Sequence, residues 1–335
     1  MAGSNWSMKP RLSDETIFCS TVIPTVARPT LDRAVRSVLE QAFSREGFEV
    51  IVVNDSGKTL SSADWQGLER VRVLETQRRE RSVARNAGAA IARGRYLHFL
   101  DDDDWLNPGA LEAFWSLAEE NPAADWLYGS TQLVDQQGTP IIQLQHGMQG
   151  NRFIQVMAGE WIPLASSLVR AAAFFERGGF NPLINAGEDV DLCRRIALKG
   201  EFAGAPAVVA NMVRGSQGTT TDYARLDAYS RMARERILAE HGVHARMRAS
   251  ADSSYWRGRI TRAFLTSAVW NLQRGQLFTA ASRAANGGVS VLLAGTSLFS
   301  LEYWRAVLRS YQSRTFARGF QEARPGLARK SLAQK

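Results

Sequence analysis

The chain has 335 residues and a mass of 37.1 kDa, which is enough to bury a full core. Hydrophobic residues make up 45% of it and charged residues 22%, a balance typical of globular proteins that excludes an intrinsically disordered chain. The formal net charge of +8 suits nucleic acid, an anionic membrane surface or a phosphorylated ligand, and charge alone does not choose among them.

The two cysteines, Cys19 and Cys193, lie far apart and show neither metal-ligand nor redox spacing. We expect both to be small core residues of a protein kept in a reducing compartment. Residues 1–16 lack the apolar stretch of a signal peptide, and no segment approaches the ~20 apolar residues that span a bilayer. These features predict a cytoplasmic protein, and they leave open a peripheral contact at the inner face of the membrane.

From residue 16 to about residue 109, short apolar runs alternate with amphipathic stretches, which predicts βαβ units around a largely parallel sheet. The first expected strand covers residues 18–23 and should stop at Pro24, and Thr30 is the expected cap of the next helix. Further strands are expected over 49–54, 71–74 and 96–100, with helices over 31–42, 83–91 and from 108 onward.

From residue 124 the expected elements are mixed, with strands over 126–134, 140–145 and 164–169 and helices over 153–158, 171–176 and 189–198. Beyond about residue 224 the chain is helical and Arg-rich, with candidate helices over 229–241, 255–274, 276–286 and 297–309. We therefore expect a disordered segment at 1–15, a main α/β domain at 16–223, a helical C-terminal region at 224–313 and a basic tail at 314–335.

Four adjacent aspartates, Asp101 to Asp104, directly follow an expected strand. Their carboxylates repel one another, and a divalent cation or solvent must relieve that repulsion. Mg²⁺ and Mn²⁺ accept one or two carboxylates and fill their other positions with water and phosphate oxygens. Asp101 and Asp103 share one side of an extended turn and are the expected ligands, with Asp102 and Asp104 as second choices. A solvated acidic turn that caps the following helix is the alternative.

The position of the acidic run favours the metal. In open α/β sheets, ligands bind beyond the carboxyl ends of the strands, and three polar segments stand at such ends. They are Pro24 with Thr25, Asn54 with Asp55, and the acidic run itself. The Asp55 carboxylate could accept hydrogen bonds from a base or a ribose, although an Asx turn that ends the strand would explain it equally well.

At this point the sequence resembles a known family. The segments Thr21–Thr25, Val52–Ser56, Ala84–Gly88 and Gly94–Asp104 match, in order and spacing, the blocks of a family 2 glycosyltransferase with the GT-A fold. Each block is weak alone, but together with a fifth they extend the resemblance over about residues 16–221. The resemblance implies a Rossmann-like mixed sheet flanked by helices, here with a helical C-terminal appendage.

The resemblance also implies roles for single residues. Pro24, Thr25 and Asp55 would line the nucleobase pocket, and the first and third aspartates of the acidic run would form the Asp-x-Asp metal site, with Asp102 as a candidate substrate contact. Arg85 would lie near the nucleoside and the diphosphate, a role that suits the bidentate geometry of a guanidinium. The alternative for Arg85 is a surface arginine paired with Glu80.

The fifth block runs from Gly187 to Leu192, and the resemblance implies that Asp189 is the general base that deprotonates the acceptor hydroxyl. Glu188 is a candidate substrate contact, and it stands with Asp191 behind Asp189 for the role of base. All three acidic residues would also favour the start of a helix, which is the structural alternative. A single base opposite the leaving diphosphate implies inversion at the anomeric carbon.

Some features depart from the family or remain open. No Gln-x-x-Arg-Trp motif occurs, so a single-transfer enzyme is favoured over a processive synthase. Gly215 stands where many relatives have a histidine, and Arg214 beside it is a candidate to hold phosphate in compensation, with a loop arginine as the alternative. Trp161 precedes the strand expected to border the acceptor and is a candidate sugar platform or a core residue. His98 is expected to be a core residue.

The Arg-rich C-terminal region has three interpretations: a solvated helical cap, a membrane contact lying on the surface, or a module that binds a partner protein. The cap is the default. The membrane contact would use apolar side chains beside two arginines, and lipid-linked acceptors would give it a purpose. The residues concerned are Leu292, Leu293, Leu298, Phe299, Trp304, Arg305 and Arg309.

The function that these features predict is an inverting, metal-dependent glycosyltransferase that uses a nucleotide-sugar, most simply a UDP-sugar, with Mg²⁺ or Mn²⁺. Its acceptor would be a saccharide or a lipid-linked molecule in glycan, lipopolysaccharide or exopolysaccharide synthesis. The alternatives are a sugar-phosphate nucleotidyltransferase and a non-catalytic protein that binds nucleotides or a membrane. Nucleic-acid binding is not expected, because the arginines are scattered without interleaved aromatic residues.

Overall fold

The computed structural model describes residues 16–77, 80–145, 149–184, 186–214, 232–250 and 252–308, without the side chains of 248 and 249. The disorder expected at 1–15, the domain boundary at 223–224 and the basic tail at 314–335 lie outside these residues. In the described part of the chain, no helix has both the length and the apolar character needed to cross a bilayer.

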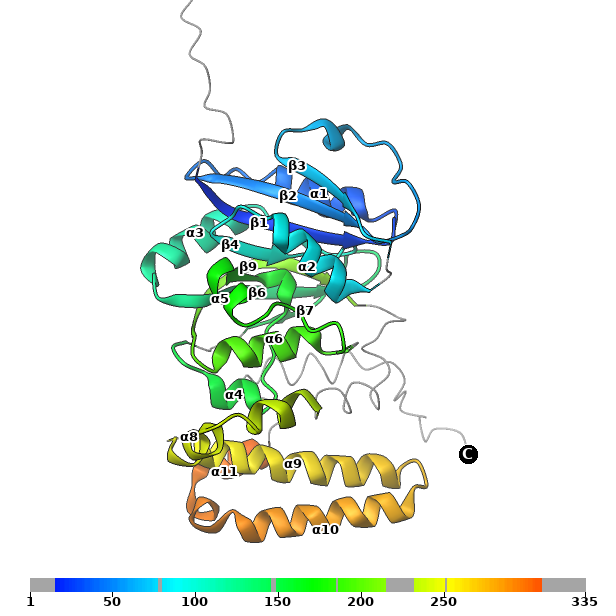
Figure 1. Ribbon diagram of the computed structural model, residues 1–335. Coiled ribbons are helices and arrows are strands. Elements are labelled where there is room, and N and C mark those ends of the chain that lie inside the picture. The colour runs from blue at the N-terminus through cyan, green and yellow to red at the C-terminus, as the bar shows by residue number, and fades with distance from the viewer. Residues whose placement is uncertain are drawn as a thin grey trace, which may run out of the picture.

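One mixed sheet of nine strands organises the main domain (Figure 1). The strand order is β3-β2-β1-β4-β8-β6-β9-β5, with β7 paired to β6. The first four strands are parallel to one another, whereas β8 is antiparallel to its neighbours β4 and β6. The expected mixed sheet is therefore confirmed. The strands are β1 (Ile17–Thr25), β2 (Gly47–Asn54), β3 (Val71–Glu75), β4 (Tyr96–Phe99), β5 (Trp105–Leu106), β6 (Ala124–Val134), β7 (Pro140–Leu144), β8 (Ser167–Arg170) and β9 (Glu201–Val213).

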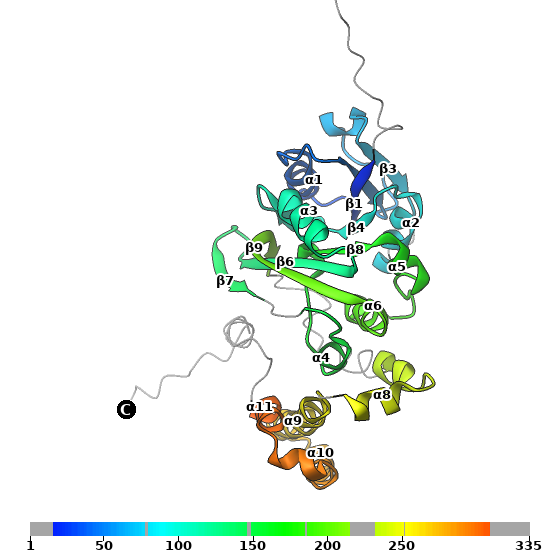
Figure 2. The ribbon, with the colours of Figure 1, turned by 90° about the vertical axis from the view of Figure 1, so that its left-hand side faces the viewer.

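Helices cover both faces of the sheet (Figure 2). The strand β2, between β3 and β1, is buried on both sides, since Val50 and Val52 belong to one core cluster and Ile51 and Val53 to the other. The first cluster includes side chains of α1 and α3, and the second includes side chains of α2, α4, α5 and α6. The helices of this domain are α1 (Leu31–Leu39), α2 (Arg81–Ile91), α3 (Ala110–Glu120), α4 (Phe153–Met157), α5 (Ala171–Glu176) and α6 (Glu188–Ala197).

Several local expectations are wrong. β1 does not stop at Pro24 but continues to Thr25, because only β2 pairs with the strand there and the missing N–H is not needed. Thr30 occupies the N-cap position of α1, but its side chain makes no capping hydrogen bond. The expected strand over 164–169 begins as a 3₁₀ turn, Leu164–Ser166, before β8.

The long strand β9 is absent from the expected elements. Gly204 and Pro206 belong to an irregularity in the pairing of β9 with β6. Tyr128 pairs with Gly204 and Ser130 with Val208, so β9 carries extra residues between these pairs. A Cβ atom on Gly204 would lie 2.3 Å from the ring of Tyr128, which explains the glycine.

The C-terminal region is helical, as expected, and lies at the end of the molecule opposite β3 (Figure 1). Its helix α10 runs through Gly287, beyond the expected end at residue 286, and the missing side chain of that glycine lets Leu265 of α9 approach closely. Residues 232–238 form the described part of the helix expected over 229–241. The region contains α8 (Val243–Ala249), α9 (Ser253–Leu272), α10 (Leu277–Leu293), a 3₁₀ turn (Gly295–Phe299) and α11 (Leu301–Leu308).

Gly88 sets the distance between α2 and the sheet. A Cβ atom at this position would lie 2.4 Å from a methyl carbon of Val22 and 2.9 Å from one of Val53. Val22 belongs to β1 and Val53 to β2, so the helix rests directly on two central strands. The absence of a side chain at Gly88 thus permits the close approach of α2 to the sheet.

We expect Gly88→Ala to lower the free energy of unfolding by about 1–3 kcal/mol, because the added methyl group overpacks the contact of α2 with the sheet. Urea denaturation followed by circular dichroism measures the change. Gly67→Ala is the matched control, since no atom lies within 4 Å of the Cβ position there. An equal loss of stability in both variants would contradict this account of Gly88.

Candidate active site

The carboxyl ends of three parallel strands meet at one edge of the sheet. The hydroxyl of Thr25, at the end of β1, donates to Oδ2 of Asp102 at 2.6 Å. The backbone N–H of Asp55, just after β2, donates to the carbonyl of Thr25 at 2.8 Å. The three polar segments expected to converge at the strand ends therefore lie together, because parallel pairing brings these ends to the same edge.

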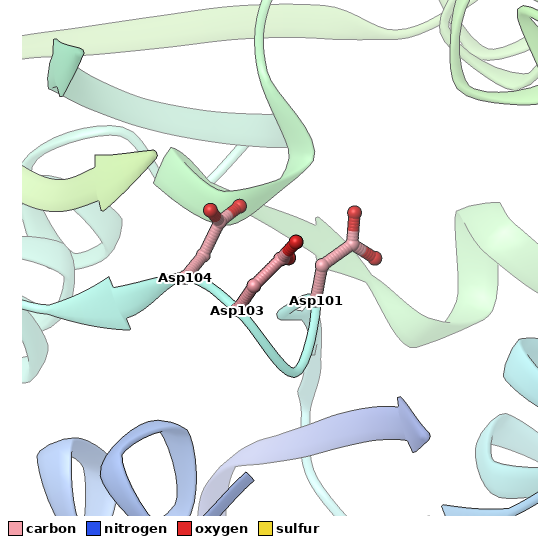
Figure 3. Close-up of side chains that lie close together, drawn as sticks. All are labelled: Asp101, Asp103 and Asp104. Carbon is pink, nitrogen blue, oxygen red and sulfur yellow. The ribbon is translucent and has the colours of Figure 1, made fainter. Parts of the chain in front are cut away.

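The acidic run forms a tight turn between β4 and β5, and three of its carboxylates gather on one side (Figure 3). Oxygen atoms of Asp101, Asp103 and Asp104 lie within 4.8 Å of one another. The backbone N–H of Val213, at the end of β9, donates to Oδ1 of Asp104 at 2.8 Å and helps to hold that carboxylate. The group thus contains the two expected ligands and Asp104, which had been a second choice.

Asp102 points to a different set of partners. Its carboxylate is buried and accepts hydrogen bonds from Thr25 and, at 2.9 Å, from Arg28. Arg28 also contacts Asp103 at 2.9 Å, and the guanidinium of Arg33 donates to the carbonyl of Asp103 at 2.8 Å. Asp102 therefore fixes the turn against the end of β1, whereas its neighbours form the carboxylate group.

Crowding perturbs the ionisation of these carboxylates. Burial raises the pKa of Asp104 well above its ordinary value, and the charges of Asp101 and Asp103 raise it further. Burial likewise raises the pKa of Asp103, and Asp101 adds to the effect. A divalent cation would remove this repulsion, and three carboxylates within reach of one ion are a donor set that suits Mg²⁺ or Mn²⁺.

Arg85 connects the acidic turn to the start of α6. Its side chain is only 3% exposed and forms ion pairs with Asp101 at 2.5 Å and with Glu188 at 2.8 Å. Burial by itself would lower the pKa of the guanidinium, but the two carboxylates raise it above its ordinary value. The proposed partner Glu80 is wrong for Arg85, because Glu80 instead caps α2 by accepting from Ser82 and Val83.

Asp189 lies in the first turn of α6, next to Glu188, and its side chain is partly exposed. Its Oδ2 accepts a hydrogen bond from the indole N–H of Trp161 at 2.7 Å. Burial raises the pKa of Asp189, the charge of Glu188 raises it further, and the Trp161 hydrogen bond lowers it. The sequence did not predict this contact, because Trp161 was considered only as a sugar platform or a core residue.

The remaining candidates have structural partners of their own. The Asp55 carboxylate accepts from the hydroxyl of Thr76 at 2.8 Å and from the backbone N–H of Glu80 at 2.6 Å. Asp55 therefore organises the segment that leads into α2. The side chain of Pro24 is half-buried at the end of β1. Arg214 directly follows Val213, whose backbone N–H holds the Asp104 carboxylate. The backbone N–H of Arg214 donates to the carbonyl of Val134.

Other groups are part of the core, as expected. His98 is buried in β4, and Cys19 and Cys193 are buried free thiols. Burial lowers the pKa of His98 to about 4. The arginines Arg28, Arg33 and Arg81 were missed by sequence reasoning, although each contacts an acidic residue of this site. The only sequence signal for them is their position just after a strand end or at a helix start.

The ion pair of Arg85 with Glu188 should carry a large energetic coupling. We expect Arg85→Met to lower the free energy of unfolding by about 3 kcal/mol, because the buried Glu188 carboxylate loses its closer guanidinium. Arg81, 3.3 Å from that carboxylate, would compensate for part of the loss. A double-mutant cycle with Glu188→Gln, measured by urea denaturation, should give a coupling above about 1 kcal/mol. The half-exposed pair of Arg305 with Glu302 is the control and should give less. A coupling energy for the buried pair below that of the Arg305–Glu302 pair would contradict this prediction.

Comparison with known proteins agrees with this geometry. The family model described as Glycosyl transferase family 2 matches residues 20–167. The poly(ribitol-phosphate) beta-N-acetylglucosaminyltransferase TarP of Staphylococcus aureus (strain N315) is 34% identical over 108 residues, which are 30% of this chain and 33% of that protein. An uncharacterized glycosyltransferase of Rickettsia conorii is 29% identical over 227 residues, 65% of this chain and 36% of that one. The chain thus spans about a third of the length of these two relatives.

Among solved structures, that of S. aureus TarS residues 1–349 in complex with UDP-GlcNAc is similar, with a TM-score of 0.59. The similarity covers 79% of this chain and 90% of that one at 13% sequence identity, so it concerns the fold. The match of the family model, the related sequences and the shared fold agree with one another. Residues 20–167 thus match glycosyltransferase family 2, and the chain has a GT-A-type fold like that of TarS residues 1–349.

Proposed function

We propose that the protein is an inverting glycosyltransferase that moves one sugar from a nucleotide-diphosphate donor to an acceptor hydroxyl. The observation that carries the proposal is a continuous set of charged groups at the carboxyl edge of the sheet. Arg85 bridges the carboxylate cluster of the acidic turn to Glu188, and Asp189 stands next to Glu188 with its carboxylate partly exposed. Groups suited to hold a diphosphate and a group suited to accept a proton therefore lie in one site.

The proposed donor is a UDP-sugar. Arg28 and Arg33 stand at the acidic turn, and a guanidinium binds phosphate oxygens through directed, paired hydrogen bonds. Pro24, Thr25 and Asp55 lie at the adjoining strand ends and would border the nucleobase. The complex of TarS with UDP-GlcNAc supports this donor class through the shared fold.

Mg²⁺ or Mn²⁺, held by Asp101 and Asp103 with Asp104 beside them, would neutralise the negative charge that develops on the departing diphosphate. Within the protein, Arg85 offsets the negative charge of Asp101. Arg28 does the same for Asp102 and Asp103, so the turn keeps its carboxylates close together.

Asp189 is the proposed general base. An acceptor hydroxyl must lose its proton as its oxygen attacks the anomeric carbon, and a positioned carboxylate can accept that proton. The raised pKa of Asp189 makes its carboxylate a better proton acceptor than an ordinary aspartate. Direct attack from the side opposite the diphosphate inverts the configuration at the anomeric carbon.

The proposed acceptor is a saccharide or a lipid-linked molecule in the synthesis of a bacterial surface glycan, such as lipopolysaccharide or exopolysaccharide. The polymer-modifying activity in the name of TarP supports an acceptor of this kind. Trp161 would lie close to the acceptor, because its indole contacts the proposed base.

Asp103→Asn and Asp189→Asn should each lower turnover by about 10² to 10⁴-fold, because one weakens the diphosphate site and the other removes the base. Release of nucleoside diphosphate from a panel of nucleotide-sugars, with and without EDTA, measures the effect. Asp64→Asn is the control, since Asp64 is an exposed residue that pairs with Arg36. Release of pyrophosphate would instead identify a nucleotidyltransferase, and nucleotide binding without any transfer would identify a non-catalytic protein.

Trp161→Phe should move the acidic limb of the kcat profile to higher pH. The base works only when it is ionised, so activity falls as the pH drops through the pKa of Asp189, which already lies above its ordinary value. Loss of the indole N–H removes an interaction that lowers this pKa, and it should also reduce kcat on the plateau by about tenfold.

Trp115→Phe is the matched control for this profile. The indole of Trp115 also donates to a carboxylate, that of Glu46 at 3.2 Å, but this pair lies before β2 and on α3, at the opposite edge of the sheet. Its removal should leave the profile in place. An unchanged acidic limb in Trp161→Phe would exclude Asp189 as the group that titrates.

A further inference from the structure

Exposed apolar side chains are concentrated in the C-terminal helices. Of the 19 large hydrophobic residues that are exposed in the described part of the chain, 12 lie within residues 265–308. Three of them are almost fully exposed: Phe278 at 89%, Leu292 at 80% and Phe299 at 93%. Single exposed hydrophobic residues are ordinary on a protein surface, but such a concentration marks a surface that binds something.

Helix α10 presents most of this apolar surface. Its exposed positions Phe278, Ala281, Ala285, Val289 and Leu292 recur at intervals of three and four residues and form one stripe. The stripe runs from Phe278 to Leu292, so it extends for about 21 Å along the helix. The helix contains one charged residue, Arg283, whose position in the sequence puts it away from the stripe.

The opposite side of α10 is already used by the fold. Ala280 and Gly287 are buried, and Gly287 lies against Leu265 of α9. Figures 1 and 2 show α10 as the outermost helix, with α9 between it and the main domain. Its apolar stripe therefore faces away from the catalytic sheet and is not covered by any described part of the chain.

The same region carries the positive charge of the protein. Residues 253–335 contain 13 Lys and Arg and only 2 Asp and Glu, whereas residues 1–252 contain 28 and 31. The excess charge thus belongs to the helical region and the basic tail, and the remainder of the chain is slightly acidic. At the turn between α9 and α10, Arg274 stacks on Trp270 with its guanidinium 3.6 Å from the ring centre.

We propose that α10 docks the protein on an anionic lipid surface, with the helix parallel to the membrane plane. The apolar stripe from Phe278 to Leu292 enters the boundary between headgroups and acyl chains. The excess of arginine over acidic residues in residues 253–308 supplies the attraction to anionic headgroups. A tryptophan beside an arginine, as at the turn, is suited to the interface itself.

Charge decides between a lipid surface and a second copy of the chain. Self-association through α10 would bring two strongly positive regions together, which electrostatic repulsion opposes. An anionic bilayer satisfies the apolar stripe and the surrounding positive charge at the same time. The docking is independent of the proposed catalytic function, because none of its residues belongs to the site at the acidic turn.

The full-length protein should sediment with vesicles made of an equal mixture of phosphatidylcholine and phosphatidylglycerol, and far less with phosphatidylcholine alone. The double variant Phe278→Ser and Leu292→Ser should lower the ratio of bound to free protein at least about tenfold, because both side chains enter the bilayer in the docked state. Release of nucleoside diphosphate with a soluble acceptor should not change.

The control exchanges two other exposed leucines, Leu68 and Leu183 of the main domain, for serine and should keep wild-type vesicle binding. Circular dichroism melting verifies that both double variants are folded. Equal vesicle binding by wild type and the α10 variant would overturn the proposal. A wild-type dimer in light scattering that the α10 variant converts to a monomer would overturn it in favour of a second copy.

Discussion

The site depends on one buried guanidinium, that of Arg85, which lies between two carboxylates from distant parts of the chain. Arg85 is carried by α2, and its guanidinium contacts Asp101 after β4 and Glu188 at the start of α6. A guanidinium removed from water in this way is stable only while both anions remain in place. The relative positions of the acidic turn and the helix that carries Asp189 are therefore set by the same side chain.

Much of this architecture follows from short sequence patterns. The apolar run from Val50 to Val53 predicts a strand buried on both faces. In the structure β2 is such a strand, with its side chains divided between two core clusters. The polar residues Thr25, Asp55 and Asp101 stand at the ends of parallel strands, so their convergence follows from topology before any side chain is placed. The close contact of α2 with the sheet depends on a single residue, Gly88, where a Cβ atom would collide with Val22 and Val53.

What could not be predicted depends on contacts between distant segments. Glu80 was the alternative partner considered for Arg85, whereas the structure pairs Arg85 with Asp101 and with Glu188, which is 103 residues away. Trp161 reaches Asp189 only because the segment before β8 lies against the start of α6. In β9, Gly204 and Pro206 obey the local rules for a loop, and pairing with β6 overrides those rules.

Hydrogen bonds from α9 to the main domain affect how the two parts of the molecule can be separated. Tyr255 of α9 donates to the buried carboxylate of Glu160, and Arg259 donates to the carbonyl of Ala158 at 3.0 Å. Glu160 directly precedes Trp161, so α9 supports the segment whose indole contacts Asp189. The helical region therefore cannot be removed without consequence for the site. Cutting the chain before α9 would remove the helices together with the contacts that hold the segment before Trp161.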